Sequence, residues 1–136
     1  MTKRIKVKII EKILLSVVIS LHLYFLILEM FLWTTPIGIE SFKMTEIFAQ
    51  ESKVLAANQG LYNGFLAVGL LLSFFIKNVP SKYCLRRYLL ACVVVAGVYG
   101  GLTVGTKIFV IQAIPAILAL GASFIVTKKQ LFGGLR

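Results

Sequence analysis

Four long runs without a charged side chain constrain the fold of this chain more than any other feature. They cover residues 13–28, 54–76, 88–106 and 108–127. A helix needs roughly 20 apolar residues to cross a membrane, because each residue adds about 1.5 Å. The first run reaches that length by continuing through Glu29 to Trp33. We therefore expect an all-α, integral membrane four-helix bundle in one domain. Its helices are expected at about residues 10–33, 54–76, 88–106 and 108–127.

The basic residues indicate which side of the membrane each loop faces. A net charge of +10 would suggest a nucleic-acid partner for a soluble protein. Here, however, five of the fifteen basic residues precede the first helix, four lie between the second and third, and three follow the fourth. Because loops rich in Lys and Arg stay in the cytoplasm, both termini are expected there (N-in/C-in).

This distribution predicts a multi-pass protein of the cell (inner or plasma) membrane. Lys82, Arg86 and Arg87 are expected at headgroup level, and anionic lipid headgroups at the cytoplasmic face are the expected partners, without nucleic acid. The first apolar run exceeds the roughly 7–15 residues of a signal peptide, so we interpret it as an uncleaved anchor. Cys84 and Cys92 are expected to stay reduced. A single histidine gives no zinc-ligand spacing, so neither a metal nor a cofactor is predicted.

Two ionisable side chains fall within the first span. His22 and Glu29 are seven residues apart, about two turns, so both point to nearly the same helix face, which Trp33 continues. A carboxylate inside a span is costly and usually faces a bundle interior or a cavity. For Glu29, a functional role and simple contact with outer water are both open. The simpler interpretations are a His22 bonded to a neighbouring helix and an interfacial Trp33.

The second span carries a group of amides. Thr45 is a predicted N-cap, so a helix is expected to begin near residue 45, follow the outer interface over about residues 45–53 and run into the span. Asn58, Gln59 and Asn63 then fall within six residues. Gly60 and Gly64 form a Gly-x-x-x-Gly step that permits close helix approach. The amides therefore either join helices or line a polar pocket.

The last two spans add small and polar residues. Gly97, Gly101 and Gly105 recur at four-residue steps, which predicts a packing face that would also serve a homo-oligomer. Pro115 removes a backbone donor and is able to kink the fourth helix.

Polar residues of all four spans fall at one depth, in the outer half. Facing lipid would leave them unpaired, so they most economically share one interior cavity. We therefore predict a small, outward-opening polar pocket with its floor near His22. Its candidate residues are His22, Glu29, Trp33, Asn58, Gln59, Tyr62, Asn63, Tyr99, Thr103 and Gln112.

Several of these segments resemble the signature of a known family. They are HLYF at 22–25, LEMFLWTTP at 28–36, AANQGLYNG at 56–64, VAGVYG at 95–100 and QAIPA at 112–116. The family is a bacterial and fungal group of four-helix membrane proteins catalogued as domain of unknown function 1304. The resemblance covers nearly the whole chain and implies a small inner-membrane protein of four spans. Some members carry the automatic name epimerase, but this chain has neither a Gly-rich dinucleotide loop nor an aspartate.

Three functions of different classes stay open. The first is binding or transport of a cation, a polar metabolite or a lipid headgroup. In size and first-helix Glu the chain resembles the small multidrug exporters, which however have weak charge bias and no such amide run. The second is a structural or partner-binding role. The third is an enzyme acting on a lipid or isoprenoid, with His22 and Glu29 as acid and base. These two lie about 10–11 Å apart along the axis and would need substrate or water between them.

Overall fold

The structure is a computed structural model that describes residues 3–132, and this part of the chain is helical apart from short turns. The elements are α1 (Lys3–Phe31), α2 (Pro36–Phe42), α3 (Glu46–Leu72), α4 (Val79–Thr103), α5 (Thr106–Ile108), the π-helix η1 (Phe109–Ala113) and α6 (Ile114–Phe132). The predicted all-α fold with four long apolar helices is thereby confirmed.

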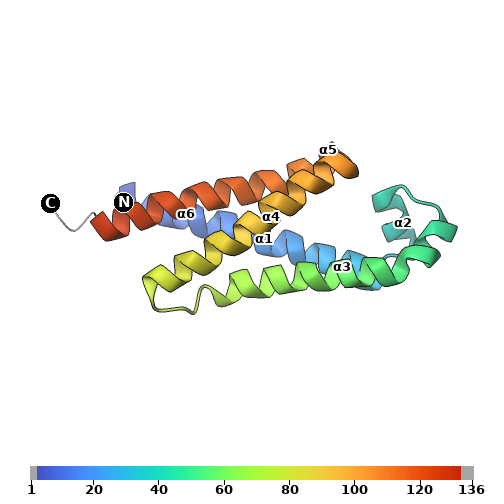
Figure 1. Cartoon of the computed structure of the whole chain (residues 1–136), viewed down its shortest axis with the longest axis horizontal. Coiled ribbons are helices and arrows are strands. Elements are labelled where there is room, and N and C mark those ends of the chain that lie inside the picture. The colour runs from blue at the N-terminus through green and yellow to red at the C-terminus, as the bar shows by residue number, and fades with distance from the viewer. Residues whose placement is uncertain (1–2, 133–136) are drawn as a thin grey trace.

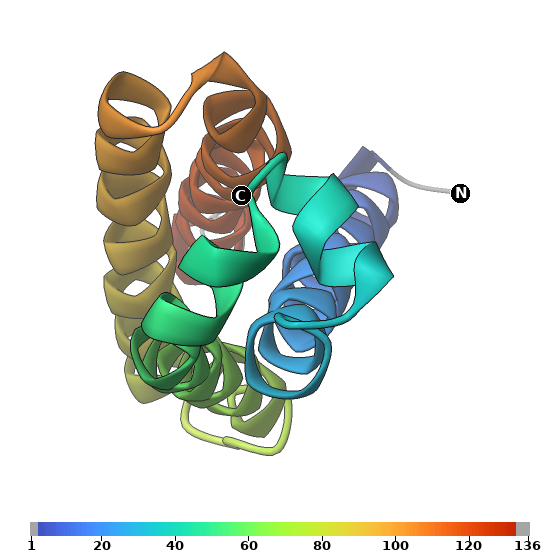
Figure 2. The same ribbon diagram turned by 90° about the vertical axis from the view of Figure 1, so that its right-hand side faces the viewer.

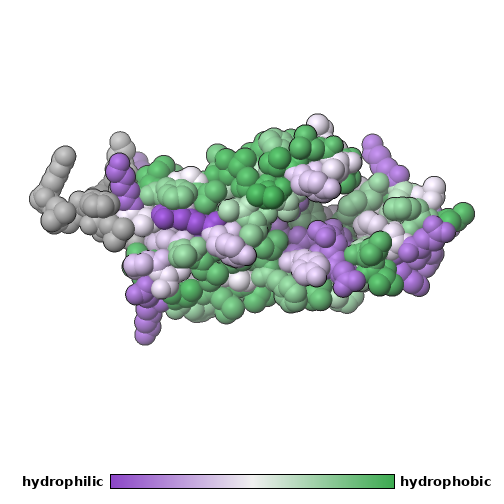
Figure 3. Space-filling view, viewed as in Figure 1, coloured by the Kyte–Doolittle hydropathy of each residue, from purple (hydrophilic) through white to green (hydrophobic). Residues whose placement is uncertain are grey.

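The four long helices are long and apolar enough to cross a membrane. The segments concerned are Ile5–Phe31, Glu46–Leu72, Val79–Thr103 and Thr106–Lys128. They form an elongated bundle, with α2 at one end and the start of α1 and the end of α6 at the other (Figure 1). We name these the α2 end and the terminal end. Hydrophobic surface covers the long helices, and most hydrophilic surface gathers at the two ends (Figure 3).

Capping residues determine where α3 and α4 begin. The hydroxyl of Thr45 accepts a hydrogen bond from the Phe48 amide at 3.2 Å, so the interfacial segment and the second span are one continuous helix. The side chain of Asn78 accepts from the Ser81 amide at 2.9 Å. This cap starts α4 at Val79, well before the expected residue 88, because capping and apolar length are independent signals.

The segment between the first two long helices forms a short helix of its own, α2. Pro36 occupies the first turn of α2, where its missing N–H costs nothing. Gly38 is buried, and a Cβ at this position would collide with the backbone oxygen of Leu32. The same proline that separates this segment from α1 therefore begins α2, which folds back onto the end of α1.

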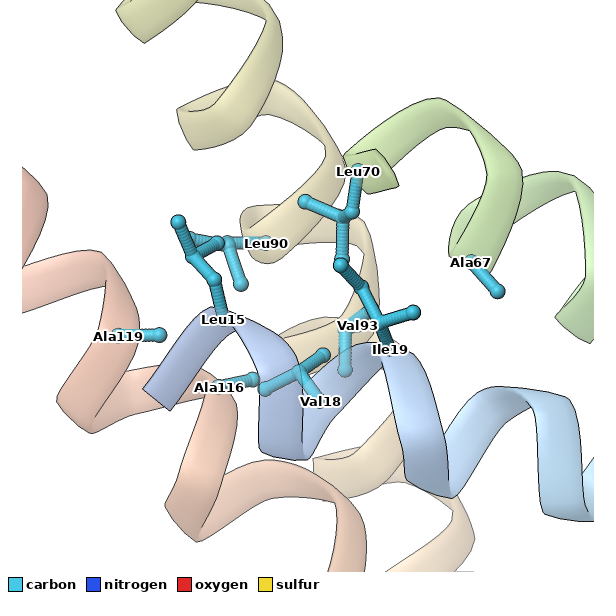
Figure 4. Packing of buried hydrophobic residues seen from close by; sticks show 9 residues of the cluster. All are labelled: Leu15, Val18, Ile19, Ala67, Leu70, Leu90, Val93, Ala116 and Ala119. Atoms are coloured by element: carbon cyan, nitrogen blue, oxygen red, sulfur yellow. The ribbon is translucent and has the colours of Figure 1, made fainter. Parts of the chain in front are cut away.

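Helix α1 packs against both α3 and α6, and α4 packs against α6 and η1. Helices α3 and α4 diverge from their connecting turn towards the α2 end (Figures 1 and 2). In the middle of the bundle, nine buried apolar residues of four helices meet (Figure 4). They are Leu15, Val18, Ile19, Ala67, Leu70, Leu90, Val93, Ala116 and Ala119.

The fourth span is irregular where it enters the bundle. Pro115 has no N–H, so the carbonyl of Ile111 loses its usual helical partner, and the π-helix η1 comes immediately before this point. Ala113 of η1 is buried, and a Cβ added at Gly97 of α4 would lie 2.7 Å from its backbone nitrogen. The missing side chain of Gly97 therefore lets α4 approach the π-helix closely.

Gly97→Ala tests this close approach. The added methyl group must push the Ala113 backbone away, and overpacking of this kind costs typically about 1–3 kcal/mol. We expect a lower melting temperature in detergent, measured by circular dichroism. Gly121→Ala is the matched control, because a Cβ there meets nothing within 4 Å and improves helix propensity. Equal melting temperatures for the two variants would contradict the proposed close packing.

Candidate functional site

A carboxylate of α1 and an amide of α3 meet in the half of the bundle near α2. Nδ2 of Asn63 donates a hydrogen bond to Oε2 of Glu29 at 2.7 Å. Asn63 is only 4% exposed, and Glu29 is half-buried. A Cβ at Gly60 would lie 3.1 Å from the Glu29 Cβ and 2.7 Å from Cγ of Met30. Gly60 therefore brings α1 and α3 close enough for this hydrogen bond.

Two oxygen atoms of the Glu29–Asn63 pair stay available. No described residue donates to Oε1 of Glu29 or to Oδ1 of Asn63, and neither atom is fully enclosed. No described cation neutralises Glu29 either, since the ion pair of the described chain joins Arg86 to Glu11. The pair thus presents two free acceptors, which a hydrogen-bond donor or a cation would complement.

His22 lies deeper on the same face of α1 and is 1% exposed. Its Nδ1 lies 2.8 Å from the Val18 carbonyl oxygen and donates to it, so the expected bond to a neighbouring helix is replaced by one within α1. This bond is local because the acceptor lies one turn earlier on the same helix. The other ring nitrogen, Nε2, is enclosed and has no partner among the described residues.

Two other predicted site residues have polar partners elsewhere. Nε1 of Trp33 donates to the Ser52 hydroxyl at 3.0 Å, and its ring packs against Phe42 with 4.6 Å between centroids. Nδ2 of Asn58 donates to the Val54 carbonyl of its own helix at 3.2 Å. Trp33, which follows α1, is therefore bonded to the start of α3 and packed on α2, whereas the side chain of Asn58 makes no hydrogen bond to another described helix.

The remaining predicted residues lie mostly on outward faces. Gln59 is exposed, and Tyr62 and Tyr99 are 61% and 69% exposed. Thr103 is exposed and donates to the Tyr99 carbonyl at 2.8 Å, while Gln112 is partly buried in η1. The structure thus joins Glu29 and Asn63 but does not gather all ten residues around one point.

Four cavities of the described chain have other linings. The largest, about 820 Å³, lies between α2 and the start of α3, and another of about 500 Å³ lies between α1, α2 and the α4–α5 turn. One of about 550 Å³ borders the first turns of α4, and one of about 250 Å³ lies at the terminal end. None of these four is lined by any of the ten predicted residues.

The predicted packing glycines have different surroundings. Gly64 lies against Leu26 of α1, as Gly60 lies against Glu29 and Met30. On α4, a Cβ at Gly101 would lie 2.6 Å from Cβ of Phe109. Gly105 lies in the turn after α4, where a Cβ would meet nothing within 4 Å. The close contacts therefore involve Gly60, Gly64, Gly97 and Gly101.

At the terminal end, the structure joins polar residues that the sequence analysis did not select. Nη1 of Arg86 lies 3.0 Å from Oε1 of Glu11, and its Nε donates to the Ser73 hydroxyl at 2.8 Å. The Tyr83 hydroxyl donates to Oε2 of Glu11 at 3.3 Å. Glu11 is 2% exposed and Arg86 3%. Arg86, expected at headgroup level, is therefore inside the bundle, because Glu11 neutralises it there.

Helical periodicity contained a signal for this cluster. Glu11 precedes Glu29 by eighteen residues, which is five helical turns, so it lies on the same face of α1. Its partner Arg86 could not be predicted from periodicity, because Arg86 belongs to a segment far away in the sequence.

Arg87, also expected at headgroup level, lies against the bundle. Its Nη2 donates to the Thr127 hydroxyl at 2.7 Å, and its guanidinium lies 4.0 Å from the Phe124 ring centroid.

Arg86→Met tests the buried ion pair. It leaves Glu11 enclosed without its counter-charge, and breaking such a pair costs about 3–5 kcal/mol. We expect a marked fall in thermal stability in detergent. The double variant Glu11→Leu/Arg86→Met removes both charges and should recover most of the loss. A double variant no more stable than the single one would show that the ion pair does not determine stability here.

The chain is similar to known sequences over most of its length. Residues 16–124 match the family model described as protein of unknown function (DUF1304). The chain is 33% identical over 115 residues to the uncharacterized protein YpaA of Lactococcus lactis subsp. lactis (strain IL1403), which covers 82% of this chain and 95% of that protein. No solved structure matches it significantly. The resemblance seen in the sequence is confirmed, and the chain belongs to the DUF1304 family.

Proposed function

We propose that this protein crosses the cell membrane four times and binds a small cationic or polar ligand from the outer side, through Glu29 and Asn63. The orientation rests on the charges of the loops. The α2 end carries three acidic residues, Glu40, Glu46 and Glu51, whereas most lysines and arginines belong to the other side. With positive loops in the cytoplasm, the α2 end faces outward.

The observation that carries this proposal is the pair of free acceptors on Glu29 and Asn63. A charged side chain inside a span is costly, and such residues are usually paired. Asn63 supplies one hydrogen bond but no charge. A bound ammonium group would supply both the missing charge and donors for Oε1 of Glu29 and Oδ1 of Asn63.

The shape of the bundle supports access to this pair from the α2 end. Helices α3 and α4 diverge in that direction, and hydrophilic atoms are visible in the hollow between them (Figure 3). Gln59 is exposed one turn before Asn63 on α3 and is placed to add a further amide. The ligand would therefore enter beside α3.

The structure favours binding over transport in this conformation. Between Glu29 and the Arg86–Glu11 pair lies the apolar cluster of Figure 4, to which α1 contributes Leu15, Val18 and Ile19. Among the described residues this cluster separates the two polar regions, and passage of an ion would need another conformation. Acid–base catalysis is less well supported, because Nε2, the ring nitrogen of His22 that is left free, is enclosed and has no partner among the described residues.

Glu29→Gln tests the proposed ligand class. Methylammonium chloride should raise the melting temperature of the protein in detergent above that in sodium chloride of equal ionic strength. Tetramethylammonium chloride, which carries the charge but has no N–H to donate, should raise it less. A ligand at a hundred times its Kd stabilises by about 2.7 kcal/mol. The variant should lose this shift, because it lacks the charge. Glu40→Gln, which changes an exposed carboxylate of α2, should keep it. The proposal fails if Glu29→Gln responds like the unchanged protein.

A purely structural role for Asn63 predicts a different result. This role has to be tested because Gly60 and Gly64, on either side of Asn63 in α3, pack closely against α1. Asn63→Leu should abolish the ammonium response and leave or raise the melting temperature if the amide serves a ligand. If it only joins helices, stability should fall, by about 0.6 kcal/mol on average for such bonds. Asn58→Leu is the control, since Asn58 bonds to its own helix. Thermal unfolding with and without the salts distinguishes the two.

A further inference from the structure

The cavity of about 250 Å³ at the terminal end lies between α1, the α3–α4 turn and the first turns of α4. We name it the Arg86 cavity. Its polar lining consists of Lys8, Glu11, Lys12, Lys82, Tyr83 and Arg86. Pockets for drug-sized ligands measure roughly 300–1,000 Å³, so this cavity suits one small charged group. Neither Glu29 nor Asn63 lines this cavity, so it is separate from the site proposed above.

Arg86 is held rigidly in the wall of this cavity. Its Nε donates to Ser73 and its Nη1 to Glu11, and its guanidinium carbon lies 4.7 Å from the Phe74 ring centroid. Nη2 has no acceptor among the described residues, yet it is not fully enclosed. A guanidinium that is 3% exposed therefore retains a fixed donor in a cavity that it lines.

The charges around the cavity are unbalanced. Both oxygens of Glu11 are occupied, Oε1 by Arg86 at 3.0 Å and Oε2 by the Tyr83 hydroxyl at 3.3 Å. Glu11 therefore neutralises Arg86 only. The three lysines that line the cavity form no ion pair among the described residues. The cavity therefore contains several hydrogen-bond donors and about three uncompensated positive charges. An anion with several acceptor oxygens would bind the donors and neutralise the charges.

We propose that the Arg86 cavity binds a phosphate group, carried either by an anionic lipid headgroup or by a soluble phosphate. Arginine provides fixed donors for phosphate oxygens, and lysines add mobile charges around them. Lys8 and Lys12 approach from α1 and Lys82 from α4, so the group would be held between two helices. Basic pockets between membrane helices on the cytoplasmic side are known to hold lipid headgroups.

The double variant Lys8→Ala/Lys82→Ala tests this site in the full-length protein. Its matched control, Lys43→Ala/Lys107→Ala, removes the same charge at the opposite end of the bundle. Native mass spectrometry in detergent measures binding of dioleoyl phosphatidic acid, with dioleoylglycerol as the lipid without phosphate. Inorganic phosphate is then added as a competitor. We expect the affinity for phosphatidic acid to fall on the order of 20-fold in the first variant and little in the control.

The outcomes separate the two sources of phosphate. Loss of phosphatidic acid binding without competition by inorganic phosphate supports a headgroup site. Displacement of the lipid by inorganic phosphate, or binding of inorganic phosphate alone, supports a site for soluble phosphate. The proposal is overturned if both double variants lose equal affinity, since general charge attraction then explains the binding. It is also overturned if the unchanged protein binds neither probe.

Tyr83→Phe provides a second test that does not alter the charge. Without the hydroxyl, Oε2 of Glu11 loses its donor and becomes free to repel a phosphate oxygen. We expect weaker binding of phosphatidic acid. A cooperative thermal transition in phosphate-free buffer is the check on folding, at a somewhat lower melting temperature because a buried hydrogen bond is lost. Full affinity in a folded Tyr83→Phe variant would contradict the role given to Glu11. Because the cavity and Glu29 are distinct, neither result bears on the ammonium site.

Discussion

Burying polar side chains inside an apolar bundle costs free energy, and this structure depends on how the ionisable side chains of α1 are paired. One face of this helix carries Glu11, His22 and Glu29. Each is accommodated differently: Glu11 by an arginine, His22 by a backbone carbonyl of α1, and Glu29 by an amide. The partners of Glu11 and Glu29 lie on α4 and α3, so these two side chains join α1 to both helices.

The two ends of the bundle consequently have opposite chemistry. At the terminal end, donors are in excess, because Glu11 neutralises Arg86 and leaves the neighbouring lysines unpaired. Near the α2 end, acceptors are in excess around Glu29. The apolar cluster between them keeps the two regions apart. Such an arrangement suits two independent ligands of opposite charge better than one continuous path.

The position of the predicted site residues along the helices was predictable from the sequence, whereas rotation about a helix axis was only partly so. Glu29 and Asn63 were both selected, and they meet because Gly60 lets α1 and α3 approach. Tyr62 and Tyr99 were selected for the same depth, but their side chains point outward. The α2 helix was not predicted, because a helix of seven residues that starts at a proline is too short to show a clear hydrophobic period.

By itself, the sequence determined the helical class, the four apolar segments and the Thr45 cap, because length, hydropathy and capping act over a few neighbouring residues. Only the tertiary structure decided the partners. Glu11 and Arg86 lie 75 residues apart and Glu29 and Asn63 lie 34 apart, so their pairing depends on how helices pack and rotate. Local patterns do not encode that packing, which arises from contacts between distant faces.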